Sequence, residues 1–258
     1  MELNVLLITQ ARMSSTRLPG KIFKEINGKK LLEIHIERLK QAKLVDKILI
    51  ATTNNPSDNI VSDWAIKNNL LVFRGSEFDV LDRFYRAALP FLPKWIVRVT
   101  SDCPLLDPKL IDAVIELADR SEVDYASNIL IEHFPDGQDV EVFTFTTLKN
   151  AWQSAKLASE REHVTPFIRN NINALGRKLF KAVNYDSPSD FSDIRMTVDE
   201  PADLELVKQL VMELGINADW KEYVDYIKKH NLNKINSSII RNEGYLKSIK
   251  NDKDINNG

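Results

Sequence analysis

The chain of 258 residues is poor in cysteine and in long apolar runs, and its charges nearly balance. Its one cysteine, Cys103, excludes an intrachain disulfide and a multi-cysteine metal site, and a single thiol fits a reducing cytoplasm. No apolar run approaches the roughly 20 residues of a membrane-spanning helix, and residues 3–8 are too short for a signal peptide. The formal net charge of -2 gives no broad basic field for nucleic acid or an anionic membrane. We therefore expect a cytoplasmic protein with no nucleic-acid or membrane partner, in which any cationic site is local.

Several common signatures of enzyme sites are also missing. The chain has no G-x-x-x-x-G-K-[ST] phosphate loop, no G-x-G-x-x-G fingerprint, no H-E-x-x-H and no G-x-S-x-G. Its four histidines are scattered and show no triad order. A functional site must therefore be sought in other patterns.

What the chain does contain, near its start, is a basic loop that follows a short apolar run. Arg12, Arg17 and Lys21 are spaced along a segment rich in serine and threonine. Arginine offers forked donors that match phosphate oxygens in pairs, lysine adds a mobile charge, and backbone N–H groups can complete an anion-binding nest. The pattern favours a polyphosphate site, and the alternative is a solvated surface loop with scattered charge.

The first half of the chain alternates between apolar or β-branched runs and segments with helical periodicity. The pattern predicts strands at 4–9, 47–53, 70–73 and 95–100, and helices at 31–40, 58–68, 79–89 and 109–118. This alternation predicts an α/β fold with a mostly parallel sheet covered by helices on both faces. In such a sheet the loops that follow the strands meet along one edge, where ligands of open α/β sheets bind.

The second half is less regular. The pattern predicts strands at 140–145, 179–184 and 194–198, and helices at 147–158, 162–171 and 201–214. We interpret residues 1–231 as one domain, in which residues 134–171 interrupt the alternation as an insertion. Residues 232–258 form a C-terminal extension rich in Asn, Lys, Ile and Asp, and we predict a solvated tail after about Leu246.

Two aspartates follow predicted strands at the same edge as the basic loop. Asp102 comes directly after the fourth predicted strand, so its carboxylate should project into the crevice. A hard oxygen ligand opposite a basic loop is what Mg²⁺ bound to nucleotide phosphates needs. Asp107, by contrast, directly precedes a helix and is typical of an N-cap. Helix capping alone also explains Asp199, although a carboxylate at a helix start can still offer an oxygen to a metal.

A third acidic group lies on the strand predicted at 140–145. Strand alternation places Asp139 and Glu141 on one face. Two carboxylates on one face repel each other unless they share a cation, a polyol or an amino ligand, and the alternative is a solvated edge strand. Glu162 and His163 follow on a predicted helix, where neighbours point about 100° apart, which disfavours a shared metal.

Six short motifs occur in a fixed order. A-R-x-x-S-x-R-L-P-G-K at 11–21 is followed by A-T-T-N at 51–54, V-x-x-D-x-P-L at 99–105 and D-x-P-x-D-L at 199–204. G-x-D-V-E-V-F at 137–143 and R-E-H-V-T at 161–165 lie between them. Together they resemble the acylneuraminate and deoxyoctulosonate (KDO) cytidylyltransferases, which activate acidic sugars as CMP derivatives. The resemblance is closest to the spore-coat polysaccharide biosynthesis branch of that superfamily.

The resemblance implies a Rossmann-like sheet of the nucleotide-diphospho-sugar transferase (GT-A-like) type. It implies a homodimer built by the insertion at 134–171, whose partner chain helps wall the acceptor pocket. Arg12, Arg17 and Lys21 would bind the CTP phosphates, and Asp102 and Asp199 would hold Mg²⁺. The residues expected to be catalytic are Arg12, Lys21 and Asp102. The further nucleotide contacts expected are Thr9, Gln10, Ala11, Thr53 and Ser101, and the expected acceptor contacts are Asp139, Glu141, Glu162 and His163.

The chain departs from the sialic and KDO enzymes in one respect. They usually carry Gly-Ser-Lys or a similar run where residues 13–16 read M-S-S-T, so Lys21 must supply more of the charge at the α-phosphate. The acidic pair Asp139 and Glu141 also fits a sugar carboxylate poorly, which favours an amino sugar or a polyhydroxylated acceptor.

The expected activity is a Mg²⁺-dependent transfer from CTP to a sugar-like acceptor, with release of pyrophosphate, for surface-polysaccharide or glycoconjugate synthesis. Three alternatives stay open at this point. They are a cytidylyltransferase acting on a phosphorylated alcohol, a glycosyltransferase-type enzyme that binds a nucleotide-sugar, and a catalytically silent regulatory or scaffold domain.

Overall fold

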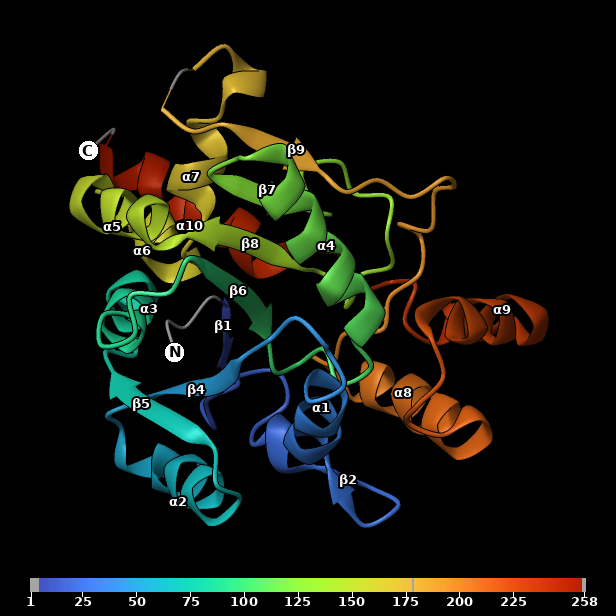
Figure 1. The fold of residues 1–258 in the computed structure, drawn as a ribbon. Coiled ribbons are helices and arrows are strands. Elements are labelled where there is room, and N and C mark those ends of the chain that lie inside the picture. The colour runs from blue at the N-terminus through green and yellow to red at the C-terminus, as the bar shows by residue number, and fades with distance from the viewer. Residues whose placement is uncertain (1–4, 178, 257–258) are drawn as a thin grey trace.

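The computed structural model describes residues 5–177 and 179–256, and its central feature is a seven-stranded sheet in the order β5-β4-β1-β6-β8-β7-β9 (Figure 1). The strands are β1 Val5–Gln10, β4 Lys47–Thr53, β5 Leu71–Gly75, β6 Trp95–Thr100, β7 Tyr125–Ser127, β8 Glu141–Thr144 and β9 Ala182–Asn184. Strands β5, β4, β1 and β6 are parallel to one another. Strand β8 is antiparallel to both β6 and β7, and β9 is parallel to β7. The prediction of a mostly parallel α/β sheet is confirmed. Asn4, the first residue of the strand predicted at 4–9, lies outside the described residues.

Helices cover both faces of this sheet, as predicted. They are α1 Leu31–Leu39, α2 Asn59–Lys67, α3 Val80–Ala88, α4 Pro108–Ser121, α5 Phe145–Ser154, α6 Ala158–His163, α7 Pro166–Asn170, α8 Pro201–Leu214, α9 Trp220–His230 and α10 Glu243–Asn256. Because side chains alternate along a strand, Leu7 of β1 packs in one core with α1, α2, α4, α8 and α9. Leu6 and Ile8 point the other way and pack in a second core with α3, α5 and α7.

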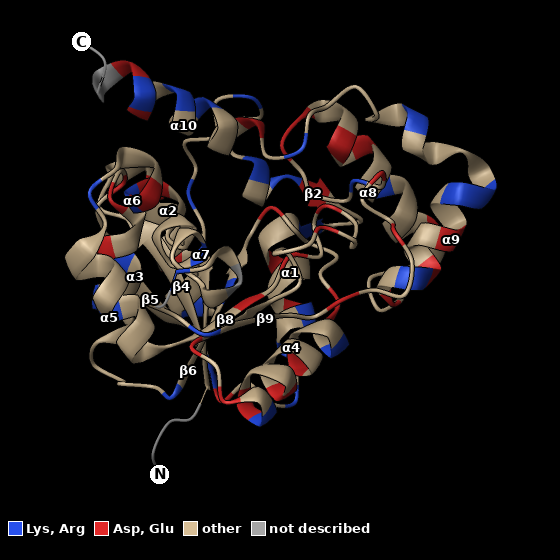
Figure 2. Ribbon diagram, turned by 90° about the horizontal axis from the view of Figure 1, so that it is seen from above, with Lys and Arg blue, Asp and Glu red and all other residues tan. Residues whose placement is uncertain are grey.

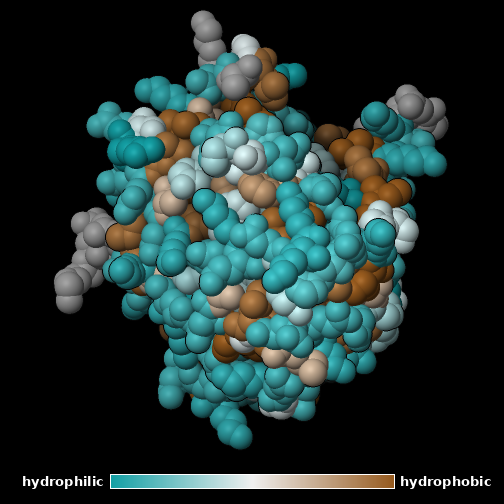
Figure 3. All heavy atoms as spheres, turned by 90° about the vertical axis from the view of Figure 1, so that its right-hand side faces the viewer, coloured by the Kyte–Doolittle hydropathy of each residue, from teal (hydrophilic) through white to brown (hydrophobic). Residues whose placement is uncertain are grey.

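Short elements complete the described chain. They are the hairpin strands β2 Glu25–Ile26 and β3 Lys29–Lys30 and the 3₁₀ helices η1 Lys21–Phe23, η2 Pro56–Asp58, η3 Asn173–Leu175 and η4 Leu232–Ile235. The side of the molecule that carries α8 and α9 is mainly hydrophilic, with small separate hydrophobic patches (Figure 3). None of the helices described here combines the length and the apolarity needed to cross a membrane.

The second half of the chain differs from the prediction in three places. The helix predicted at 162–171 is broken into α6 and α7, because Val164 adopts a φ of 71° and Pro166 opens a new helix. The strand predicted at 179–184 is shortened to β9. The strand predicted at 194–198 is an extended segment whose backbone forms a single bridge, between Asp136 and Arg195, among the described residues.

The prediction of a solvated tail after Leu246 is wrong for residues 247–256, and residues 257 and 258 lie outside the described residues. These positions belong to α10, which packs against α6 (Figure 2). Ser248 and Asp252 are four residues apart, lie on one helix face and are buried. The Asp252 carboxylate accepts a hydrogen bond from the backbone N–H of Ser159 at 3.2 Å. Polar contacts therefore hold a helix whose composition resembles that of a disordered segment.

Candidate active site

The basic loop, residues 11–20, turns back on itself at the carboxyl end of β1. The backbone N–H of Met13 donates to the Asp58 carboxylate at 2.7 Å, and the N–H of Gly20 donates to the Met13 carbonyl at 3.2 Å. Gly20 has a φ of 66°, a conformation that glycine adopts without a steric penalty. This turn directs Lys21, the first residue of η1, toward the edge of the sheet.

A cavity of about 350 Å³, which we call the loop cavity, lies between this loop and the carboxyl ends of β1 and β6. The predicted nucleotide contacts that line it are Gln10, Ala11, Arg12, Arg17, Lys21 and Ser101, and the predicted metal ligand Asp102 lines it as well. Asp199, Glu162 and His163 also line it, although they come from distant parts of the chain. The parallel sheet therefore brings most of the predicted site residues to one place.

Two predicted nucleotide contacts, Thr9 and Thr53, do not line the loop cavity. Both are fully buried. The Thr9 hydroxyl is hydrogen-bonded to Nε2 of His35 at 3.0 Å, and the Thr53 hydroxyl donates to the Asp58 carboxylate. Thr53 therefore supports the basic loop indirectly, because Asp58 also accepts the backbone N–H of Met13.

The floor of the loop cavity is a cation held between two carboxylates. Nζ of Lys21 lies 2.8 Å from Oδ2 of Asp102 and 2.7 Å from Oδ1 of Asp199. The Lys21 side chain is only 12% exposed. Asp102 is 81 positions and Asp199 is 178 positions from Lys21 in the sequence, yet both direct a carboxylate oxygen at its single positive charge.

The electrostatics of this group favour its charged form. Burial would lower the pKa of Lys21, but the charges of Asp102 and Asp199 outweigh burial and raise it. Burial would likewise raise the pKa of Asp102, whereas the Lys21 ammonium holds it well below the usual range of an aspartate. Two carboxylates that already converge on one cation fit the donor set that Mg²⁺ takes from a protein. Within the described residues no cluster of three or more acidic, His or Cys side chains is placed to hold a metal, so further ligands would come from phosphate and water.

Backbone hydrogen bonds explain why Asp102 and Asp199 lie side by side. The Asp102 carbonyl accepts the N–H of Val198 at 2.7 Å and the hydroxyl of Thr197 at 3.2 Å. On the other side, the N–H of Met196 donates to the Asp136 carbonyl at 2.7 Å. A side chain at Gly137 would lie 2.7 Å from the Thr197 nitrogen, so this close approach requires glycine.

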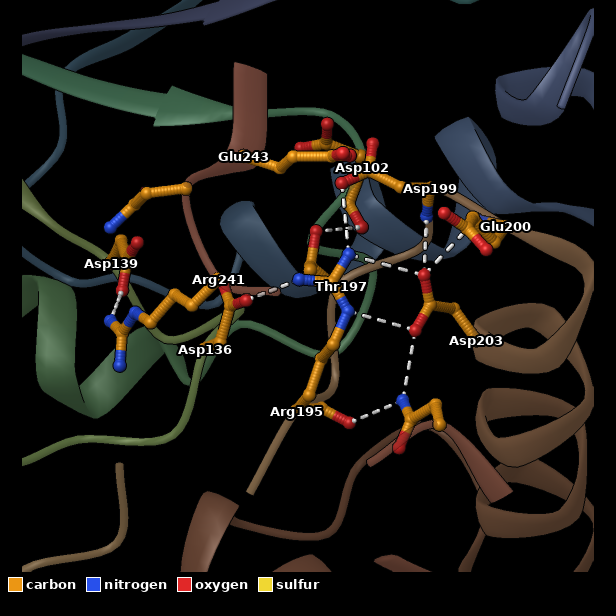
Figure 4. Close-up of polar contacts among 12 residues, drawn as sticks. Asp102, Asp136, Asp139, Arg195, Thr197, Asp199, Glu200, Asp203, Arg241 and Glu243 are labelled. Carbon is orange, nitrogen blue, oxygen red and sulfur yellow. Dashed lines mark hydrogen bonds and ion pairs between the residues drawn. The ribbon is translucent and has the colours of Figure 1, made fainter. Parts of the chain in front are cut away.

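Arg195 fixes the orientation of this acidic group (Figure 4). Its guanidinium donates to Asp136 at 2.5 Å, to Asp199 at 2.9 Å and to Asp203 at 2.9 Å. Asp203 is fully buried and also accepts the backbone N–H groups of Asp199 and Glu200, the two residues that precede α8. Capping of α8 is therefore done by Asp203, and the explanation of Asp199 as a cap is wrong. The cap predicted at Asp107 is confirmed, since its carboxylate accepts the N–H of Lys109.

A second cavity of about 260 Å³, which we call the inner cavity, adjoins the loop cavity and shares with it the charged residues Arg17, Asp102, Asp199 and Glu243 and also His163. It extends past β6 to the start of β8. Its remaining charged lining residues are Arg98, Glu132, Asp136, Asp139, Glu141, Arg169 and Arg195.

Asp139 and Glu141 both line the inner cavity, but they do not share a cation. Glu141 is buried, forms an ion pair with Arg98 and accepts the Tyr125 hydroxyl at 2.6 Å. Asp139 forms its own ion pair with Arg241 at 3.0 Å. Each carboxylate is therefore neutralised by a separate arginine, and the reason for expecting an amino sugar, an unpaired acidic pair, is absent from the structure.

The two carboxylates nevertheless differ in their affinity for protons. Burial raises the pKa of Asp139 to about 7, against the opposing charge of Arg241 and with the help of Asp136. For Glu141 burial acts in the same direction, but the charge of Arg98 outweighs it and lowers the pKa. Asp139 thus titrates near neutral pH while Glu141 stays ionised.

Glu162 and His163 meet at a hydroxyl from the C-terminal helix. Ser248 donates to the Glu162 carboxylate at 2.8 Å, and its oxygen lies 3.0 Å from Nε2 of His163. The hydroxyl also lies 3.1 Å from the Gly244 carbonyl, and when it donates to either of these oxygens its own oxygen can accept the N–H of His163 at Nε2. Burial lowers the pKa of His163 to about 4, so its ring is neutral at pH 7.

Sequence reasoning did not identify Arg195, Arg98 or Arg169 as site residues, nor any part of the C-terminal extension. A signal for Arg195 was present: between 194 and 199 the apolar residues alternate with Arg195, Thr197 and Asp199, which places these three on one side of an extended segment. The C-terminal extension, residues 232–258, carried no such signal, because its cavity-lining residues do not alternate regularly with apolar residues.

Comparisons with known proteins agree with this geometry. A family model described as cytidylyltransferase matches residues 6–237. The spore coat polysaccharide biosynthesis protein SpsF of Bacillus subtilis is 34% identical over 223 residues, which is 84% of this chain and 90% of that protein. A 3-deoxy-manno-octulosonate cytidylyltransferase of Syntrophotalea carbinolica is 28% identical over 113 residues, 44% of each chain. A solved cytidylyltransferase structure from Leptospira borgpetersenii superposes with a TM-score of 0.82 at 31% identity, covering 93% of this chain and 100% of that one.

Proposed function

The chain belongs to the cytidylyltransferase family, and from this membership we propose that it transfers CMP from CTP to a sugar-like acceptor and releases pyrophosphate. The observation that carries the proposal is the adjacency of the two cavities. The loop cavity holds Arg12, Arg17 and Lys21, which suit a triphosphate, and the inner cavity offers acids and arginines to a polar acceptor. Asp102 and Asp199 stand where the two cavities meet.

The cations of the loop cavity are held in place before any nucleotide binds. Arg17 pairs with Asp199 at 3.0 Å and with Glu243 at 3.2 Å, and Lys21 pairs with two aspartates. Arg12 is more exposed, at 45%, and lies 3.4 Å from Glu77. A triphosphate would exchange these carboxylate partners for phosphate oxygens, which bind guanidinium groups in pairs.

Mg²⁺ is the proposed cofactor, and Asp102 and Asp199 are the residues that would hold it. The convergence of both carboxylates on Lys21 supports this assignment, because the same oxygens already share one cation. When bound, the metal would neutralise charge on the phosphate oxygens. Lys21 and Arg12 supply the fixed positive charge of the protein itself at the same place.

In the proposed reaction an acceptor oxygen attacks the α-phosphorus in line. The new bond joins that oxygen to the α-phosphorus, the bond from the α-phosphorus to the α–β bridging oxygen breaks, and pyrophosphate leaves. The work of the protein is positioning and charge neutralisation, so it needs no nucleophile of its own. The similarity to a spore coat polysaccharide protein supports a polyhydroxylated, sugar-like acceptor for surface-polysaccharide or glycoconjugate synthesis. The homodimer and the cytoplasmic location stay predictions.

A panel of sugars and phosphorylated alcohols, each incubated with CTP and Mg²⁺ and assayed for pyrophosphate, tests the proposal. We expect pyrophosphate with at least one sugar, and no release when EDTA is added. If pyrophosphate is released with a phosphorylated alcohol and with none of the sugars, the acceptor is a phosphorylated alcohol and the proposed sugar-like acceptor is wrong. Release of CMP or UDP from nucleotide-sugars, without pyrophosphate from CTP, would contradict it in favour of a glycosyltransferase.

A further inference from the structure

Residues beyond 237, where the family match ends, form part of the inner cavity. The lining residues from this C-terminal segment are Ile240, Asn242, Glu243, Gly244 and Tyr245. The resemblance implied that a partner chain helps to wall the acceptor pocket, and the chain's own C-terminal segment also contributes to the lining of this cavity.

Specific polar contacts hold the segment at the rim of the inner cavity. Arg241 donates to the Asp139 carboxylate and to the Phe134 carbonyl, each at 3.0 Å, and the Asn242 amide donates to Glu132 at 2.9 Å. The Arg241 side chain is 15% exposed. The segment is thus bound to the start of β8 and the loop before it, and it does not merely lie over the opening.

Tyr245 lies against two residues that line the inner cavity, His163 and Arg169. Its ring lies 5.1 Å from the His163 ring in an edge arrangement, and the Arg169 guanidinium lies over the same ring at 5.3 Å. Nε of Arg169 is buried and has no hydrogen-bond partner. Arg17, Arg98 and Arg195 each form ion pairs with carboxylates, whereas no ion pair to Arg169 occurs within the described chain. Arg169 is therefore a cation of this cavity with donors left for a ligand.

Ser248, one helical turn after Gly244, holds the other side of His163. Its hydroxyl has two oxygen acceptors, Glu162 and the Gly244 carbonyl, and this arrangement favours a proton at Nε2 of His163 and a free lone pair at Nδ1. Nδ1 makes no hydrogen bond among the described residues, and His163 lines both cavities. The C-terminal helix therefore sets the tautomer of a ring at the junction of the two cavities.

We propose that residues 240–248 are part of the acceptor-binding site of their own chain, with Tyr245 as a wall that orients Arg169 toward an oxygen of the acceptor and Ser248 as the residue that positions His163. This inference rests on the proposed function, in that it assumes that the inner cavity receives the acceptor.

Binding of simple sugars to the full-length protein tests the wall. The probes are 3-deoxy-manno-octulosonate, glucosamine and mannose, each titrated in the presence of CMP and followed by saturation-transfer NMR. We expect at least one probe to bind the wild type and to bind Tyr245→Ala about tenfold more weakly. The matched control is Leu246→Ala on the outward side of the same helix, where Leu246 is 54% exposed, and it should bind as the wild type does. CTP affinity, measured by calorimetry, should stay within about twofold in both variants, because Tyr245 does not line the loop cavity.

Three results would overturn the inference: equal probe binding by Tyr245→Ala and the wild type, equal losses in Tyr245→Ala and Leu246→Ala, or no binding of any probe. The acceptor panel separates this inference from the proposed function. If no acceptor in that panel releases pyrophosphate from CTP while probe binding still depends on Tyr245, the proposed function is refuted and the role of Tyr245 in ligand binding stands. For the positioning role, ¹⁵N NMR of the His163 ring should show Nε2 protonated in the wild type and a mixture of tautomers in Ser248→Ala. An unchanged tautomer in that variant would remove Ser248 from the inference.

Discussion

Replacing Lys21 with alanine probes the cation between the two carboxylates most directly. The variant leaves Asp102 and Asp199 facing each other without the ammonium that now lies 2.8 and 2.7 Å from them. It should lower both the stability of the protein and its activity with CTP. It should also strengthen the binding of Mg²⁺, because the metal no longer competes with Lys21 for the same oxygens.

The magnitude follows from the two hydrogen bonds. A hydrogen bond to a charged group contributes about 1.5–3 kcal/mol, and partial exposure places the pair at the lower end, about 2 kcal/mol in all. In a chain of this size that corresponds to a fall in Tm of about 4–8 °C at pH 7. Lys21 holds the pKa of Asp102 below its ordinary value, so this stabilisation is present above about pH 4 and is lost as the pH falls further. The two proteins should therefore converge in stability at low pH.

Calorimetry and steady-state kinetics measure these effects. With EDTA the Tm of Lys21→Ala should fall as stated, and millimolar Mg²⁺ should restore part of it. The kcat/KM for CTP should fall by about 10- to 100-fold, since one charged phosphate contact is lost. An unchanged Tm in EDTA with Mg²⁺ affinity equal to that of the wild type would refute the reasoning that these carboxylates form one cation site.

Four further variants separate chemistry from structure. Asp199→Asn should reduce Mg²⁺-dependent turnover and, because this partly exposed carboxylate pairs with Lys21 and Arg195, lower the free energy of unfolding by about 1–2 kcal/mol. Asp203→Asn should lower it by about 3–5 kcal/mol, because Asp203 is fully buried against Arg195, and equal Tm losses would contradict this division. The raised pKa of Asp139 means that the folded protein binds one more proton than the unfolded chain between about pH 4 and 7. The free energy of unfolding should therefore fall as the pH rises through that range. In a series of denaturation curves at different pH, Asp139→Asn should make this fall smaller. Thr53→Val should cost about 1–3 kcal/mol of stability and leave the KM for CTP unchanged; a raised KM would return Thr53 to the nucleotide site.

The parallel half of the sheet could be predicted closely because its strands are continuous apolar runs. The predicted ranges for the first four long strands lie within two residues of β1, β4, β5 and β6. Parallel strands also determine where their following loops meet, and for that reason the positions of Arg12, Lys21 and Asp102 could be anticipated. The short strand β9 and the extended segment at 194–198 could not be resolved in the same way, since three to five residues give too little periodicity to assign a pairing.

Partners far apart in sequence lay beyond this reasoning. Alternation placed Asp139 and Glu141 on one face, but nothing local indicated that Arg241, 102 positions from Asp139, or Arg98, 43 positions from Glu141, would neutralise them. The helix α10 was missed for a related reason. Its buried face includes Ser248 and Asp252, polar residues that become stabilising only when α6 supplies their hydrogen-bond partners.

The central claim is the transfer of CMP from CTP, and ³¹P NMR of a reaction with CTP, Mg²⁺ and an acceptor selected from the panel tests it most directly. The account predicts that pyrophosphate and a phosphodiester signal from the CMP–acceptor product grow in equal amounts, while the CTP signals decline at the same rate. Growth of CDP with inorganic phosphate, or of pyrophosphate with free CMP and no new diester, would contradict it.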